Sequence, residues 1–162
     1  MKKYIITDIG RDLDRGVLER IGLGIKSLDT EMKLNVYCLD DQEYIDGDKA
    51  RKNGDIIEGD LYIQYAEFCK KTDLKLMHKW IGPEQSRVSS QIEVVVKVTK
   101  IIDDYTICGI TDFIGEEIPI ELYSANDNKK LFKEKDTILI SRATLCIDIL
   151  GCKKKLREYC GL

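Results

Sequence analysis

The stretch QIEVVVKVTKIIDDYTICGITDFIGEEIPIEL, residues 91–122, decides the fold class of this chain. Its first third places Ile92, Val94, Val96 and Val98 at every second position, with charged or polar residues at several of the positions between them. A period of two residues is typical of a half-buried β-strand, because successive side chains point to opposite faces. The stretch therefore begins with a strand that has one apolar face.

Turn residues divide the stretch further. Asp103-Asp104 and Gly115 mark two turns, since aspartate and glycine tolerate the backbone angles that tight turns require. We expect one or two helical turns in SANDNKKLFK, 124–133, and two short strands over 138–149. Three strands, a short helix and two more strands is the order of an OB-type Greek-key barrel. The pattern, rather than any motif, predicts an OB-like five-stranded barrel over 91–150.

The N-terminal region is expected to be strand-helix-strand. KKYIITDI, 2–9, is rich in β-branched residues and predicts a strand. After it, Leu13 and Val17 begin an apolar stripe at helical spacing, and Asp12 is a suitable N-cap for that helix. Alternating apolar residues over 32–38 predict the next strand.

The predicted class is thus mainly β (α+β), in four parts. These are an N-terminal strand-helix-β region at 1–80, a linker-like stretch at 81–90, the barrel at 91–150 and a basic tail at 151–162. The sequence leaves open whether the N-terminal region forms a separate domain or packs on the barrel.

Two motifs that hold ions or phosphate are absent. Counted from Asp12, an EF-hand loop would need an oxygen ligand where Gly16 stands and a glutamate where Leu23 stands. IGLGIKS, 21–27, lacks the glycine spacing of a Walker A loop. We therefore expect no metal site and no cofactor.

The six cysteines show no metal-binding or redox spacing. Four cysteines occur singly in apolar segments with a strand-like pattern, which is typical of buried thiols; they are Cys38, Cys69, Cys108 and Cys146. A disulfide between Cys152 and Cys160 remains an alternative for the tail.

The N-terminal sequence resembles a secretory signal for only a few residues. Lys2 and Lys3 are followed by three or four apolar positions before Asp8, too few for its hydrophobic region. No apolar run approaches the length needed to span a bilayer. We expect a cytoplasmic protein without membrane contact.

Charge indicates the class of partner. The chain has a net charge of −3, and residues 101–122 contain six carboxylates and no lysine or arginine. An acidic surface attracts basic proteins and repels the phosphates of nucleic acid. The candidate partner-binding residues are Asp103, Asp104, Asp112, Glu116, Glu117 and Glu121.

The leading hypothesis is a non-enzymatic binding module, an adaptor or an inhibitor or immunity-like protein, that contacts a basic protein. One alternative is binding of single-stranded nucleic acid through lysines of the tail and the expected helix region. The lysines for that alternative are Lys129, Lys130, Lys133, Lys153, Lys154 and Lys155, with Lys135 beside them.

The other alternative is a small-molecule-binding barrel or an enzyme. No nucleophile elbow, zinc motif or dinucleotide fingerprint occurs in the sequence. His78 is the only histidine, and its position between Met77 and Lys79 is that of a half-buried strand residue. Catalysis would gain support if a deep pocket contained His78 beside a cysteine or a carboxylate.

Overall fold

The computed structural model describes residues 2–14, 17–38, 51–82, 89–123 and 132–149. Strands make up most of this part, and no helix occurs in it. The mainly β class is therefore confirmed. The described residues also include no helix with the length and hydrophobicity that crossing a membrane requires.

In the described ranges, nine strands are linked by hydrogen bonds into one sheet, in the order β1-β2-β3-β9-β4-β8-β7-β6-β5. They are β1 (Lys2–Asp14), β2 (Val17–Ser27), β3 (Lys33–Cys38), β4 (Ile56–Lys71), β5 (His78–Trp80), β6 (Gln91–Ile101), β7 (Thr106–Thr111), β8 (Ile114–Leu122) and β9 (Thr137–Ile149).

Packing divides the chain into two compact units, and β4 and β9 contribute residues to both. Unit 1 comprises the described residues within 1–60, 82–90 and 146–154, and unit 2 those within 61–81 and 91–145. Each unit is therefore assembled from segments that are distant in the sequence.

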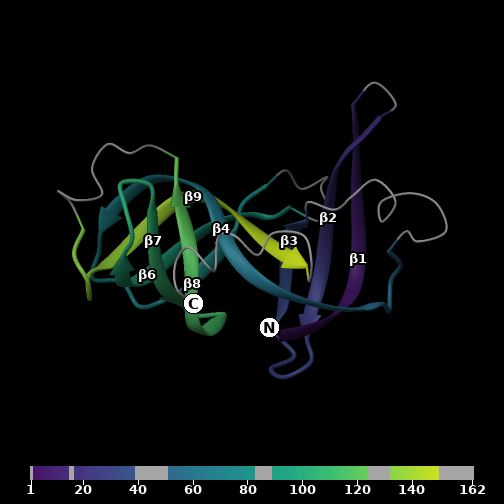
Figure 1. The fold of residues 1–162 in the computed structure, drawn as a ribbon, viewed down its shortest axis with the longest axis horizontal. Coiled ribbons are helices and arrows are strands. Elements are labelled where there is room, and N and C mark those ends of the chain that lie inside the picture. The colour runs from purple at the N-terminus through teal and green to yellow at the C-terminus, as the bar shows by residue number, and fades with distance from the viewer. Residues whose placement is uncertain (1, 15–16, 39–50, 83–88, 124–131, 150–162) are drawn as a thin grey trace. The chain divides into compact units, whose positions relative to one another are not determined.

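Unit 1 is built on the antiparallel hairpin of β1 and β2, drawn in purple and blue at the right of Figure 1. Tyr4 pairs with Ser27 and Ile6 with Ile25, and these side chains are buried. β3 extends the ladder beyond β2, and β1 also pairs with the first residues of β4. The strands predicted over 2–9 and 32–38 are confirmed.

The helix predicted after residue 10 is wrong. β1 and β2 pass through this segment as paired strands, with Asp12 opposite Arg20 in the ladder, so Asp12 caps no helix. The register of the hairpin explains the outcome. Leu13 pairs with Leu18 and Asp14 with Val17, so the residues that suggested one helical stripe belong to two strands that hydrogen-bond to each other.

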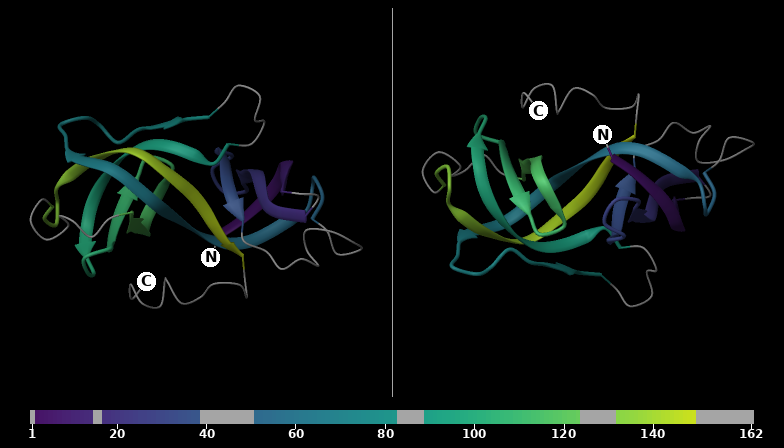
Figure 2. Two further views of the ribbon diagram at one scale, coloured as in Figure 1. Left: turned by 90° about the horizontal axis from the view of Figure 1, so that it is seen from above. Right: turned by 90° about the horizontal axis from the view of Figure 1, so that it is seen from below.

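Unit 2 is a closed ring of five strands, β4-β8-β7-β6-β9, in which β9 returns to β4. Figure 2 shows these strands curving around one interior from two further sides. All neighbours in the ring are antiparallel where the register is given, except that β4 runs parallel to β8. The buried interior is aliphatic and includes Leu61, Ile63, Val94, Val96, Val98, Ile107, Ile118, Ile120, Ile138 and Ile140.

Three strands of this ring, β6, β7 and β8, are the three predicted over 91–122. The two short strands predicted over 138–149 are wrong, because residues 137–149 form the single strand β9. The ring is completed by β4, which precedes the meander in the chain. Most of the segment predicted as a short helix, residues 124–131, lies outside the described residues, and so does the tail at 151–162.

The short strand β5 and strand β7 share one edge of β6. His78 of β5 pairs with Val94, whereas Ile110 of β7 pairs with Lys97, three residues along the same strand. The start of β5 is therefore next to the end of β7, where the chain turns into β8. This arrangement brings residues 78 and 112 together although 34 positions separate them.

Candidate functional site

One end of the unit 2 barrel carries a group of exposed aromatic side chains, and we call it the aromatic end. β4, β6 and β8 finish at this end, and β7 and β9 begin there. Tyr65 is 59% exposed, Phe68 75%, Tyr105 55% and Tyr123 64%. Single exposed apolar residues are ordinary, but a group of large ones marks an interaction surface.

Backbone hydrogen bonds place these aromatics on neighbouring strands. The N–H of Tyr123 donates to the carbonyl of Ala66, at 3.0 Å, directly beside Tyr65. The N–H of Leu122 donates to the carbonyl of Tyr105, at 2.7 Å. Because paired strands lie about 4.8 Å apart, the group extends over roughly 10 Å across β4, β8 and the start of β7.

Two of the aromatics have a strained backbone. The φ angles of Tyr65 and Phe68 are 53° and 55°, in the left-handed region that bulky residues rarely adopt. The pairing of β4 with β8 shifts register between Ile63 and Ala66. In a regular strand Tyr65 would follow Leu61 and Ile63 into the interior, so the irregularity is what turns its ring outward.

Carboxylates border the aromatic side chains on β7 and β8. Oδ1 of Asp103 accepts the N–H groups of Tyr105 at 2.9 Å and Thr106 at 2.8 Å, which fixes the turn that presents Tyr105. Asp104 is exposed next to Tyr105. On β8, Oε2 of Glu121 accepts a hydrogen bond from Nε2 of Gln64 at 3.1 Å, across to β4.

Lysines occupy the other side of the same end. We call Lys71, Lys97, Lys100, Lys133 and Lys135 the lysine cluster; all five are exposed. The turn before β9 joins them to β6, because the N–H of Lys135 donates to the carbonyl of Val98 at 2.8 Å.

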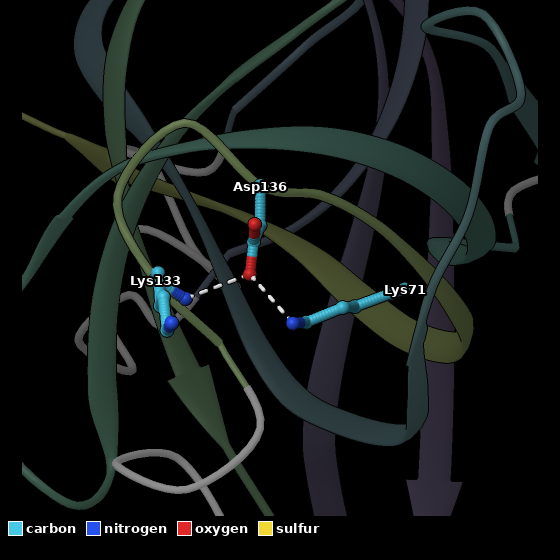
Figure 3. Close-up of polar contacts among 3 residues, drawn as sticks. All are labelled: Lys71, Lys133 and Asp136. Atoms are coloured by element: carbon cyan, nitrogen blue, oxygen red, sulfur yellow. Dashed lines mark hydrogen bonds and ion pairs between the residues drawn. The ribbon is translucent and has the colours of Figure 1, made fainter.

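Asp136 holds that turn against the end of β4, as Figure 3 shows. Its Oδ2 accepts the backbone N–H of Lys133 at 2.8 Å and lies 3.4 Å from Nζ of Lys71. The hydrogen bond from Lys133, supported by the charge of Lys71, holds the pKa of Asp136 below its ordinary value. Lys135, in the same turn, has a φ of 76°.

The opposite end of the barrel carries the single histidine. Nδ1 of His78 lies 2.7 Å from Oδ2 of Asp112, and the two side chains are 19% and 27% exposed. Trp80 and Phe113 meet the imidazole edge-on, with ring centroids 5.6 Å and 5.2 Å away. Since a carboxylate accepts only, it favours a proton on Nδ1, which leaves Nε2 as a possible base or ligand.

The six predicted partner-binding carboxylates therefore form two groups. Asp103, Asp104 and Glu121 lie at the aromatic end, where Glu121 pairs with Thr106. The other three lie at or near the turn between β7 and β8, at the histidine end; they are Asp112, Glu116 and Glu117. The structure does not bring all six together on one patch.

Of the lysines predicted for nucleic acid, the structure describes Lys133 and its neighbour Lys135, which are both in the lysine cluster. The others lie outside the described residues: Lys129, Lys130, Lys153, Lys154 and Lys155. Cys152 and Cys160 lie outside them too.

The four remaining cysteines are thiols, as predicted, and three of them, Cys38, Cys108 and Cys146, are buried. Burial raises the pKa of the Cys69 thiol to about 11, so this half-buried group stays protonated at neutral pH. Among the described residues no three or more histidine, cysteine, aspartate or glutamate side chains are grouped to hold a metal ion.

Sequence reasoning missed the aromatic group as a site, and of the lysine cluster it named only Lys133 and Lys135. Four aromatics distributed over residues 65–123 give no local signal, and an alternating pattern places Tyr65 on the buried face of its strand. The signal that was available is the sequence QYAEF, 64–68, where two aromatics three positions apart break the period of two.

Comparisons with protein-family models, with curated proteins and with solved structures find no match to this chain.

Proposed function

We propose that this protein is a non-enzymatic binding module that contacts a basic protein through the aromatic end of its barrel. The observation that carries the proposal is the group of four exposed aromatic side chains on adjacent strands. Backbone strain at Tyr65 and Phe68 supports it, because strain of this kind costs of order 1–3 kcal/mol per residue and persists at functional surfaces.

The charges beside the aromatics favour a basic partner. Asp104 and Glu121 flank Tyr105 and Tyr123, and no lysine or arginine occurs over 101–122. Arginine and lysine side chains bind aromatic faces by cation–π attraction and pair with carboxylates at the same time. Of the six predicted carboxylates, the proposed contact therefore includes Asp103, Asp104 and Glu121. The other three lie at the histidine end of the barrel and are not part of it.

The proposal also includes an OB-like fold for the barrel and a cytoplasmic location. The OB-like assignment rests on the β6-β7-β8 meander and on the closure of the ring by β9 and β4. A cytoplasmic location is supported by the thiols of Cys38, Cys108 and Cys146, since oxidising compartments favour disulfides.

An NMR titration tests the proposed function. The probe is a twelve-residue peptide of alternating arginine and glycine, and its glutamate-glycine counterpart is the control. We expect the basic peptide to shift backbone amides of residues 65–68, 103–106 and 121–123. Shifts confined to other residues, or equal binding of the acidic peptide, would contradict the proposal.

A pair of variants sharpens this test. Tyr105→Ala with Tyr123→Ala removes two cation–π partners worth about 0.5–1 kcal/mol each at exposed sites, so the dissociation constant should rise about tenfold. Leu28→Ala is the matched control, because Leu28 is 45% exposed and lies in unit 1. Equal affinities for the double variant and the control would remove the aromatics from the contact.

The His78–Asp112 pair favours a second candidate, an enzyme that uses Nε2 of His78 as a general base. The arrangement supplies an oriented imidazole. In the described part of the chain, however, the polar and ring contacts of His78 are with Asp112, Trp80 and Phe113, and none of these is a nucleophile. The binding module is therefore the better supported function.

A further inference from the structure

The aromatic end has two sides of opposite charge, and this determines the kind of partner that can cover it. On the β7–β8 side, Asp104 and Glu121 lie next to Tyr105 and Tyr123. On the β6–β9 side, Lys133 and Lys135 lie in the turn that Val98 and Asp136 hold against β6. This turn also carries two carboxylates, Glu134 and Asp136, and the five lysines of the cluster outnumber them. β4 passes between the two sides, from Tyr65 to Lys71.

The backbone of the turn that carries Lys133 and Lys135 is fixed in place. Two hydrogen bonds join Lys133 and Asp136 across the turn. The N–H of Asp136 donates to the carbonyl of Lys133 at 3.1 Å, and the carboxylate of Asp136 accepts the N–H of Lys133. Asp136 also holds the end of β4 through Lys71. A preorganised surface loses less entropy on binding than a mobile one.

We infer that the partner segment carries two blocks of charge, a basic block over the aromatic and acidic side and an acidic block over the lysine cluster. This inference rests on the proposed function and extends it to the second half of the surface. The lysine cluster would repel the part of a uniformly basic peptide that extends beyond the aromatic side, and Asp104 and Glu121 would repel a uniformly anionic polynucleotide. A segment with both charges matches both sides.

The length of the segment follows from β4. Tyr65 and Lys71 are six residues apart in this strand, so they are separated by at most about 20 Å, since the left-handed residues Tyr65 and Phe68 shorten the path. A partner segment of roughly six to ten extended residues therefore covers both sides at once. Because its two blocks are joined, binding of one block raises the effective concentration of the other.

Three peptides of equal length test the inference with the full chain by fluorescence anisotropy. The first has four arginines, a Gly-Ser linker and four glutamates, and a second version has the blocks in reverse order. The third replaces the glutamates with glutamines. We expect at least one of the two-block peptides to bind at least tenfold more tightly than the arginine-glutamine peptide. If neither two-block peptide binds more tightly, the inference is overturned.

A charge-reversal variant locates the effect. In Lys133→Glu with Lys135→Glu the advantage of the two-block peptide should disappear, while binding of the arginine-glutamine peptide persists. Lys79→Glu is the matched control, because Lys79 is an exposed lysine of unit 2 on β5, the strand that holds His78. Circular dichroism verifies that the double variant is folded. If the two-block peptide still binds this variant more tightly than the arginine-glutamine peptide does, the acidic block does not bind the lysine cluster and the inference is contradicted.

Two further results separate this inference from its alternatives. If the arginine-glutamine peptide fails to bind the wild-type chain, the proposed function itself fails, and the inference falls with it. If a twelve-nucleotide oligo(dT) displaces the two-block peptide and binds more tightly than it, a polynucleotide is the better occupant and the inference is overturned.

Discussion

Nδ1 of His78 lies 2.7 Å from Oδ2 of Asp112, and this contact joins β5 to the turn between β7 and β8. β5 has three residues and pairs with β6 alone among the described strands. The histidine is also packed between Trp80 and Phe113. The contact therefore attaches a very short strand to the body of the barrel.

Removing the carboxylate should loosen this attachment. We expect Asp112→Ala to lower the free energy of unfolding by about 1–2 kcal/mol, because His78 stays half-buried without its acceptor. Urea denaturation measures the loss. Asp73→Ala, at an exposed position of the same unit, is the control and should change stability by less than about 0.5 kcal/mol. Equal values for the two variants would show that the contact contributes no stability.

The glycines of the barrel give a matched pair for a second prediction. A Cβ at Gly109 would lie 2.3 Å from Cγ1 of Val96 and 3.0 Å from the carbonyl of Lys97, whereas a Cβ at Gly115 would have no atom within 4 Å. Gly109→Ala should therefore destabilise unit 2 by about 1–3 kcal/mol through overpacking. Gly115→Ala should be nearly neutral. Thermal and urea unfolding of the two variants check this, and similar midpoints would contradict the packing of β6 against β7.

The β meander could be predicted from the sequence because its signals are local. Alternation over 91–122 predicts β6, β7 and β8, and the turn residues between them are visible in the sequence. The helix predicted from Leu13 and Val17 failed, because apolar residues four positions apart also suit a twisted hairpin whose partner strand cannot be seen locally.

The candidate site was less predictable than the fold. It depends on which strands become neighbours, and the parallel pairing of β4 with β8 joins segments more than 50 residues apart. The register shift that exposes Tyr65 arises from that pairing. Acidic composition predicted the sign of the charge near Tyr105 and Tyr123, but the lysine cluster is assembled from three separate segments.

Acid should weaken the Asp136 turn. The pKa of Asp136 is lowered in the folded state, chiefly by the N–H of Lys133, so its carboxylate stabilises the fold above its unfolded pKa of about 3.9. That contribution is lost as the pH falls through the lower, folded value. Unfolding of wild type and Asp136→Asn should therefore differ at pH 7, with the wild type more stable, and converge at the acidic end. A difference that stays constant down to pH 2 would show that ionisation of Asp136 is not involved.

Cys69 should react slowly despite its partial exposure. Its pKa of about 11, against an ordinary value of 9.0, reduces the thiolate fraction at pH 8 by about a hundredfold, and the thiolate is the nucleophile. Iodoacetamide labelling of the native chain, read from the peptide that contains Cys69, should be slower by about this factor than labelling of the same peptide in urea. The ratio should fall as the pH is raised above 9, because the thiol of the unfolded chain is then already ionised while that of the folded chain continues to titrate. Equal rates in the native and unfolded chains at pH 8 would contradict the burial of this thiol.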